Sequence, residues 1–323
     1  MQQYAGKIFV GKELKPKINN KGKIKMKKTA LIICLLVLVA TNLLSQQGEF
    51  PKLTGPYLGQ KPPGMTPEIF APGIVSKEGD QSEMNISPDL NEIIYWERIP
   101  RNNSMSIVRI VSEKDQWKNP EILPFSSEYM NNEPSLSPDG KKLFFVSNRP
   151  LQKKGEAAKT PDIWYVERVE GNWGDPINMG APINTDSIEV QPFMSAETCF
   201  YFCKLPAAIY CSKLINGKWQ EPVKLSEKIN HGRVSSPRVS PDASCMIFHS
   251  KREDGFGGWD LYCSFKDRSG DWNESKNIGK IINTASNESD ATFSPDGKFI
   301  FFSRDGDIYW ISTKILDELR PKE

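Results

Sequence analysis

One four-residue phrase, Ser-Pro-Asp followed by a small or apolar residue, recurs along this chain and limits its fold more than any other feature. It begins at Ser87, Ser137, Ser240 and Ser294, and a decayed copy begins at Ser195. The five copies are separated by 50, 58, 45 and 54 residues. A period of this length is typical of proteins that are built from one supersecondary unit per repeat. The sequence therefore predicts five such units.

Each copy of the phrase predicts a tight turn between two antiparallel strands. Proline presets φ at the second position of a type I turn, serine accepts a hydrogen bond at the first, and glycine tolerates the exit. An aromatic run such as Leu143-Phe144-Phe145-Val146 follows each turn and fits a strand that is buried on both faces. Asp162-Ile163-Trp164-Tyr165 and its counterparts predict a third strand. A fourth is expected after Trp117, Trp173, Trp219 and Trp272. Four strands per repeat make a β-propeller blade, so the fold class is all-β.

The repeats resemble those of the TolB-like propeller family, in which Ser-Pro-Asp-Gly is the signature of a variant WD-type repeat. The resemblance covers residues 64–323. The segment 252–262 resembles the family's hairpin between second and third strands, and Ile183-Asn184-Thr185 and Ile282-Asn283-Thr284 resemble its linker between blades. The third repeat departs from the pattern, because it lacks the Pro-Asp-Gly turn and its hairpin at 205–208 is short. A distorted third blade is therefore expected.

The two ends of the repeat region predict how the ring closes. The last repeat runs out after its third strand, at residues 314–317. Residues 66–70 match the fourth-strand segment 120–123, so the amino-terminal segment is expected to complete the last blade. Closing the ring in this way removes exposed sheet edges. Five blades are favoured, and six remain the alternative, because TolB-like propellers commonly have six and residues 46–80 leave room for a degenerate element.

The amino terminus predicts export. Met26-Lys27-Lys28-Thr29 precedes an unbroken apolar run at 30–40, and polar residues follow at Ser45 and Gln46. This order is typical of a secretory signal peptide, and eleven apolar residues are too few for a membrane span, which needs roughly 20. We expect a periplasmic or secreted protein with no membrane span once the signal is removed. The expected organisation is an upstream extension and signal peptide at 1–45, a linker at 46–63 and a single propeller domain at 64–323.

The distribution of charge argues against nucleic acid as a partner. The formal net charge is +2, but residues 1–45 contain nine Lys and one Glu. The remainder therefore carries 33 basic and 39 acidic residues, a balance of −6. An acidic body repels a phosphate backbone.

A polar stripe on the first strand of each repeat supplies the candidate site. The residues four positions before the turn serine are Glu83, Glu133, Gln191, Ser236 and Asp290. The residues six positions before it are Gln81, Asn131, Glu189, Val234 and Glu288. An alternation of period two places both sets on one side of the innermost strand, which lines the axial channel of a propeller. Candidate ligand-binding residues are therefore Glu83, Glu133, Gln191, Asp290, Glu189 and Glu288.

Two interpretations of this stripe stay open. Basic residues recur at the ends of second strands and are expected to neutralise the acids blade by blade: Arg98, Arg149, Lys204, Arg252 and Arg304. This structural interpretation is favoured, because a property repeated in every blade is usually architectural. The alternative is a cation site, and calcium is the cofactor to expect there, since it accepts six to eight oxygen ligands in loose geometry, roughly 2.3–2.6 Å away.

Other recurrent residues have structural interpretations. Asp162, Asp260 and Asp307 are expected to cap the turns that precede third strands, and the recurrent tryptophans to pack between blades. The only histidines are His231 and His249, which excludes a His-rich metal site. Five cysteines follow the apolar run: Cys199, Cys203, Cys211, Cys245 and Cys263. They are interpreted as buried small hydrophobes, and pairing of Cys245 with Cys263 on neighbouring strands is the less favoured alternative.

The favoured function is that of a non-catalytic, monomeric exported propeller that binds an envelope protein or a glycan through its loop-rich faces, as the TolB-like resemblance implies. The alternative is a glycan-active hydrolase or lyase that uses the axial carboxylates. An enzyme should break the repeat symmetry at its site, whereas these acids largely follow the repeat. No Gly-x-Ser-x-Gly elbow and no phosphate-binding glycine loop occur in the chain. The sequence therefore favours binding.

Overall fold

The computed structural model describes residues 50–99, 104–152 and 155–322. The expected extension and signal peptide at 1–45 lie outside these residues. Lys52–Glu323 form one compact unit, so the part of the expected linker from residue 52 onward belongs with the propeller. Within the described part of the chain, no helix has both the length and the apolar character needed to cross a membrane.

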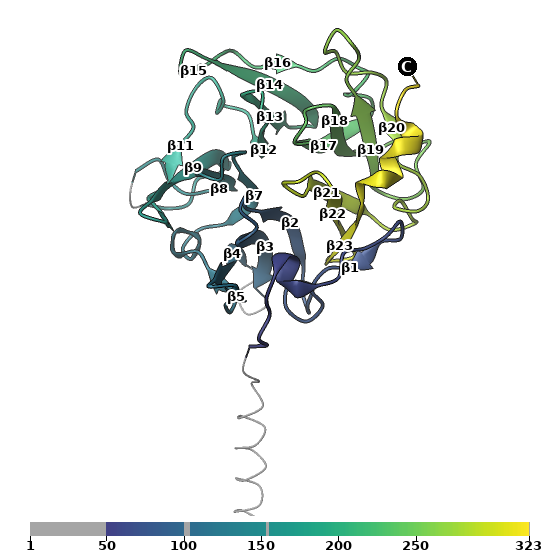
Figure 1. The fold of residues 1–323 in the computed structure, drawn as a ribbon. Helices are drawn as coiled ribbons and strands as arrows, with labels where there is room; N and C mark the ends of the chain where they lie inside the picture. The colour runs from purple at the N-terminus through teal and green to yellow at the C-terminus, as the bar shows by residue number, and fades with distance from the viewer. Residues whose placement is uncertain (1–49, 100–103, 153–154, 323) are drawn as a thin grey trace, which may run out of the picture. The chain divides into compact units, whose positions relative to one another are not determined.

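The described residues form a five-bladed, all-β propeller, as the repeats predict. The innermost strand of each blade faces the centre of the ring (Figure 1). These inner strands are β2 (Gln81–Ile86), β7 (Asn131–Leu136), β12 (Glu189–Met194), β17 (Arg233–Val239) and β21 (Glu288–Phe293). Each pairs antiparallel with the strand that follows its Ser-Pro-Asp turn.

The blades share one strand order from the centre outward. Blade one consists of β2, β3 (Glu92–Ile99), β4 (Ser104–Glu113) and the edge strands β5 (Gln116–Trp117) and β6 (Glu121–Ile122). Blade two consists of β7, β8 (Lys142–Ser147), β9 (Asp162–Val169), β10 (Asn172–Trp173) and β11 (Ile177–Asn178). Blade three consists of β12, β13 (Cys199–Lys204), β14 (Ala208–Ile215), β15 (Lys218–Trp219) and β16 (Val223–Lys224). Blade four consists of β17, β18 (Cys245–Lys251), β19 (Asp260–Phe265) and β20 (Lys276–Asn277). Blade five consists of β21, β22 (Phe299–Arg304), β23 (Asp307–Ser312) and β1 (Glu68–Ile69).

Strand β1 closes the ring, which confirms the expected role of the amino-terminal segment. Glu68 lies opposite Trp310 and Ile69 opposite Tyr309 in the β1–β23 ladder. The next residue, Phe70, is fully buried, and its ring lies 5.2 Å from the rings of both Phe301 and Trp310. The preceding turn η1 (Pro56–Gly59) also packs on blade five through Tyr57. Two further short 3₁₀ segments are η2 (Pro124–Ser126) and η3 (Thr313–Leu319).

The Ser-Pro-Asp turns have the hydrogen bonds that the sequence predicts. Ser137 Oγ donates to Asp139 Oδ1 at 2.6 Å and accepts the backbone N–H of Lys142 at 2.9 Å. The exit residue Gly140 has a φ of +67°, the left-handed conformation that glycine tolerates. The decayed third turn keeps its closing bond, from the Thr198 N–H to the Ser195 carbonyl at 3.1 Å. Blade three also keeps the strand order of blades one and two, so the expected distortion does not alter its topology.

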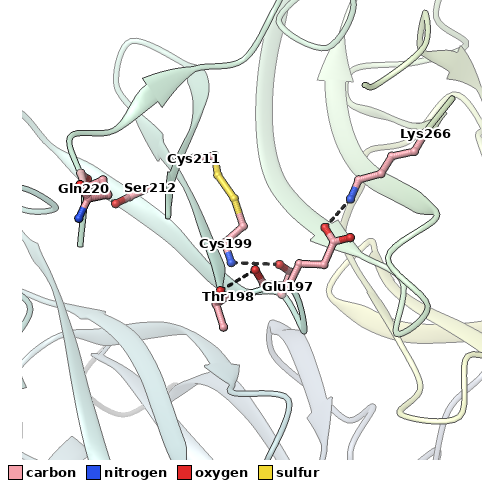
Figure 2. Close-up of a disulfide and its surroundings, with 8 residues drawn as sticks. Glu197, Thr198, Cys199, Cys211, Ser212, Gln220 and Lys266 are labelled. Carbon is pink, nitrogen blue, oxygen red and sulfur yellow. Dashed lines mark hydrogen bonds and ion pairs between the residues drawn. A yellow bond between two sulfur atoms is a disulfide. The ribbon is translucent and has the colours of Figure 1, made fainter. Parts of the chain in front are cut away.

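A disulfide joins β13 to β14 in the third blade (Figure 2). Cys199 and Cys211 are bonded with their Cα atoms 6.2 Å apart. The interpretation of all five cysteines as unpaired hydrophobes is wrong for these two, because antiparallel pairing brings them together diagonally across neighbouring strands. It holds for Cys203, Cys245 and Cys263, which are free and buried, so the less favoured pairing of the last two is not formed.

Apolar clusters between the sheets hold the blades together. One cluster combines side chains from blades four and five, including Ile247 and Ile300. Three of the recurrent tryptophans, Trp173, Trp219 and Trp272, pack against such clusters, and Trp117 is buried. The predicted packing role of these tryptophans is confirmed.

Candidate functional site

A β-bulge turns one polar side chain per blade toward the propeller axis. The ladder between the first and second strands shifts register in every blade just after the fifth residue before the turn serine. The next residue has a positive φ in all five blades, between +52° and +60°: Glu83, Glu133, Gln191, Ser236 and Asp290. A positive φ is costly for residues other than glycine, so the bulge is a built feature of each inner strand.

These five residues and Arg238 form what we name the axial cluster. Glu83 lies in blade one and Arg238 in blade four, which are not neighbours in the ring. Arg238 Nη2 nevertheless lies 3.7 Å from Glu83 Oε1, a contact that only the axis can accommodate. Glu133 Oε2 in turn accepts the backbone N–H of Gln191 from the next blade at 2.6 Å. The structure thus brings together four of the six predicted ligand-binding residues: Glu83, Glu133, Gln191 and Asp290.

Burial and mutual repulsion perturb the carboxyl groups of the axial cluster. Burial raises the pKa of Glu83 well above its usual value, the charges of Asp290 and Glu133 raise it further, and Arg238 opposes them. Burial is also the main cause that raises the pKa of Glu133 to about 7. Glu83 is only 1% exposed, and neither of its carboxylate oxygens has a partner in hydrogen-bond geometry among the described residues, although the Trp96 side chain is near enough to oppose the rise of its pKa.

Asp290 has a more polar environment. Its Oδ2 accepts hydrogen bonds from Ser82 Oγ at 2.8 Å and from Ser289 Oγ at 2.9 Å. Its backbone N–H donates to His249 Nδ1 at 3.2 Å, so this nitrogen carries no proton and the imidazole is neutral. Burial lowers the pKa of His249, which agrees with the neutral form.

The structure separates Glu189 and Glu288 from the axial cluster. Glu288 is fully buried, accepts hydrogen bonds from the Thr284 N–H and Oγ1, and forms an ion pair with Arg304 at 2.8 Å. Glu189 has the equivalent bonds to Thr185 and lies 3.5 Å from Lys204. The period-two alternation predicted one shared surface, but the bulge interrupts the alternation between the two positions.

The recurrent basic residues interact with the side chains six positions before the turn serine and not with those of the axial cluster. Arg304 and Lys204 neutralise acids at that position, and Arg149 donates to Asn131 there at 2.5 Å. Arg98 instead pairs with Asp80, and Arg252 donates to the His231 carbonyl. Blade-by-blade neutralisation is therefore confirmed for Glu189 and Glu288 only.

A pocket of about 430 Å³ opens on the face that carries the Ser-Pro-Asp turns. Its wall is mostly apolar and comes from all five blades, with Leu90, Leu136, Phe193, Val239 and Phe293 among its residues. Asn85, Arg238 and Thr292, two residues before their turn serines, also line it. Arg238 therefore belongs both to the pocket and to the axial cluster. The other members of the cluster stand four residues before their turn serines, two positions earlier than Arg238 does.

Neither Arg238 nor the placement of His249 was predicted from the sequence. Arg238 is 1% exposed, and its Nε and Nη2 atoms have no hydrogen-bond partner among the described residues. The available signal was a break in the repeat, because an arginine stands where the other blades have Asn85, Ser135, Phe193 and Thr292.

The capping role predicted for Asp260 is confirmed. Its carboxylate accepts the backbone N–H of Phe256 at 2.6 Å.

The arrangement gives little support to the expected calcium site. Among the described residues, no three His, Cys, Asp or Glu side chains are grouped so that they could hold a metal ion. A guanidinium already lies among the axial carboxyls. The cluster therefore differs from the all-oxygen ligand sets that calcium prefers.

Comparison with known proteins gives matches among solved structures. No family model matches the sequence, and no curated protein matches it. The chain is similar in fold to TolB from Agrobacterium tumefaciens, with 18% identity over 71% of each chain and a TM-score of 0.47. It is also similar to TolB from Acinetobacter baumannii, with 17% identity over 72% of this chain, 54% of that chain and a TM-score of 0.45. The catalytic domain of a GH62 α-L-arabinofuranosidase from Coprinopsis cinerea aligns at 10% identity over 77% of this chain and 97% of that chain, with a TM-score of 0.49.

Proposed function

We propose that this chain is an exported propeller scaffold that binds a ligand at its axial site and does not catalyse a reaction. The observation that carries the proposal is the contact of Arg238 with Glu83 across the axis, beneath a mostly apolar pocket. Ligand sites are typically concave and apolar with a few convergent polar groups, and this is the arrangement at the axis.

The unpartnered polar atoms favour a ligand over a purely structural role. A buried polar group without a partner costs about 1–3 kcal/mol, so a cluster kept only for stability would be fully hydrogen-bonded. Glu288 shows that this chain can satisfy a buried carboxylate completely. Both carboxylate oxygens of Glu83 and the Nε and Nη2 atoms of Arg238 lack such partners among the described residues, which fits a site whose partners arrive with a ligand.

The disulfide supports the export part of the proposal. Disulfides persist in oxidising compartments such as the periplasm and the exterior, and are rare in a reducing cytosol. The bond between Cys199 and Cys211 agrees with the signal peptide that the sequence predicts at 1–45.

A glycan-active hydrolase remains the second candidate, and one observation favours it. The pKa of Glu133 is raised to about 7, which suits a general acid near neutral pH. Asp290 is close enough for its charge to contribute to this shift. Against this candidate, a hydrogen bond from Gln191 already occupies Glu133 Oε2.

The test measures binding and turnover with the same protein. Mature wild-type protein is incubated with a panel of envelope and plant polysaccharides, and new reducing ends are counted. In parallel, its equilibrium retention on a washed envelope fraction is compared with that of Arg238→Met and of the surface control Glu121→Gln. We expect no product, saturable retention by the wild type and the control, and at least a tenfold loss in Arg238→Met. Product formation that Glu133→Gln abolishes would establish the hydrolase instead.

A further inference from the structure

Several acceptor atoms of the axial cluster are buried without a hydrogen-bond partner in the described part of the chain, and Arg238 Nη2 is the cationic donor nearest to Glu83, 3.7 Å from its Oε1. The two carboxylate oxygens of Glu83, Oε1 of Gln191 and Oδ1 of Asp290 are buried without a hydrogen-bond partner among the described residues. Glu83 and Gln191 are 1% and 9% exposed. These acceptors come from blades one, three and five, so they approach the axis from separate directions.

The carboxyl groups of the cluster outnumber its permanent cations. Three carboxyls, those of Glu83, Glu133 and Asp290, face the single guanidinium of Arg238. The neighbouring His249 is neutral, because its Nδ1 accepts the Asp290 N–H. With all three carboxyls ionised the balance would be −2, and protons on Glu83 and Glu133 reduce it, since the pKa of each is raised. An incoming monovalent cation would favour release of one of these protons.

The shape of the site indicates what kind of cation fits. A bare metal ion needs several ligands grouped at short distance, and the described residues offer no such group. An ammonium group has three donors and can hydrogen-bond to acceptors that come from three sides. The pocket meets the cluster at Arg238, and its mostly apolar wall suits an alkyl chain attached to that group.

We propose that the axial cluster binds a primary alkylammonium group, with its nitrogen toward Glu83, Gln191 and Asp290 and its alkyl chain in the pocket. The proposal rests on the proposed function and names its ligand class. A free amine and a lysine side chain of a partner share this chemistry, and the experiment separates them.

Calorimetric titration of the full mature protein tests the proposal. The probes are n-butylammonium, its neutral counterpart n-butanol, and N-acetyl-lysine methylamide with and without an acetyl group on its side-chain nitrogen. We expect the ammonium forms to bind and their neutral counterparts to bind at least tenfold more weakly. Tighter binding of the lysine derivative than of n-butylammonium identifies a protein lysine as the source, and the reverse order identifies a free amine.

Two variants connect the binding to the cluster. Glu83→Gln keeps the shape of the side chain and removes its charge, so we expect at least a tenfold loss of ammonium affinity. Glu121→Gln, the same change at an exposed glutamate, should leave the affinity unchanged. Repeating the wild-type titration in two buffers of different ionisation enthalpy should show that protons are released at about pH 7, because the ligand lowers the pKa of Glu83 and Glu133.

Equal affinity for n-butylammonium and n-butanol, an unchanged affinity in Glu83→Gln, or no binding of any ammonium probe would overturn the proposal. Such a result together with Arg238-dependent retention on envelope fractions would reject the ammonium ligand and leave the scaffold function standing. Failure of both measurements would reject both.

Discussion

Glutamates on the inner strands have different environments, depending on whether they stand four or six residues before the turn serine. Glu288, six residues before its turn, is fully hydrogen-bonded by its own blade and by the linker that precedes it. Glu83, four residues before its turn, lies at a bulge and contacts a blade on the other side of the axis. The sequence predicts both positions as one polar stripe, and it could not reveal the separation, because the bulge contains no glycine that would mark its positive φ.

The structural role of Glu288 can be tested by substitution. Glu288→Gln weakens a buried ion pair in which Arg304 Nε lies 2.8 Å from Glu288 Oε1. Removing one partner of a buried pair costs about 3 kcal/mol, so we expect the free energy of unfolding to fall by about that amount. Denaturant unfolding monitored by tryptophan fluorescence measures the change. Asp317→Asn, which weakens an exposed pair with Arg320, is the matched control and should change stability by less than about 0.5 kcal/mol. Equal effects of the two substitutions would show that the Glu288 pair is not structural.

The blades were largely predictable, because each one repeats the same local signals. Five turns and the aromatic runs after them identified the first two strands of every blade, and residues 66–70 were matched to the missing edge strand. The third blade was expected to be distorted, because its repeat lacks the Pro-Asp-Gly turn. Its backbone still makes the turn, because Ser195 keeps the hydrogen bond and Thr198 adopts a φ of +58°.

The closing strand should contribute strongly to stability through one side chain. Phe70 is fully buried against Phe301 and Trp310, whereas its neighbour Ile69 is 37% exposed. Phe70→Ala should lower the free energy of unfolding by about 3–5 kcal/mol, the usual cost of removing a buried phenylalanine ring. Ile69→Ala, on the same short strand, should cost less than about 1 kcal/mol. Thermal unfolding by calorimetry compares them, and similar midpoints for both variants would mean that the amino-terminal segment does not close the ring.

At the scale of the whole molecule, the ring creates contacts that no local pattern announces. Glu83 and Arg238 belong to blades one and four, and only closure of the propeller brings them together. Sequence analysis found four members of the axial cluster from their repeat position. Arg238 could not be assigned to the cluster from the sequence, because a single departure from the repeat does not indicate which residues of other blades it contacts.

Export is a prediction for the whole chain. The mature protein should begin near Gln46, since the apolar run at 30–40 is long enough for a signal and short for a membrane span. Mass spectrometry of protein isolated from its native source measures the amino terminus. An intact chain that retains residues 30–40 in the membrane fraction would contradict the prediction.

The pH dependence of stability separates a ligand site from a structural one. The pKa of Glu83 is raised in the folded protein above its usual value of 4.5. A raised folded-state pKa gives a stabilising contribution that is complete below the unfolded pKa and is lost as the pH rises through the folded pKa. Glu83→Gln is neutral at every pH, so the variant avoids this loss.

The free energy of unfolding of Glu83→Gln relative to the wild type, at about pH 4 and about pH 8, decides between a ligand site and a structural one. If Glu83 is there to bind a ligand, its negative charge should lower the stability of the folded protein in the absence of that ligand. We expect near-equal stability at the lower pH and a variant more stable by at least about 1.4 kcal/mol, the equivalent of one pKa unit, at the higher pH. A variant that is less stable than the wild type at the higher pH would show that the axial carboxylates hold the propeller together, and would contradict the account of the axial cluster as a binding site.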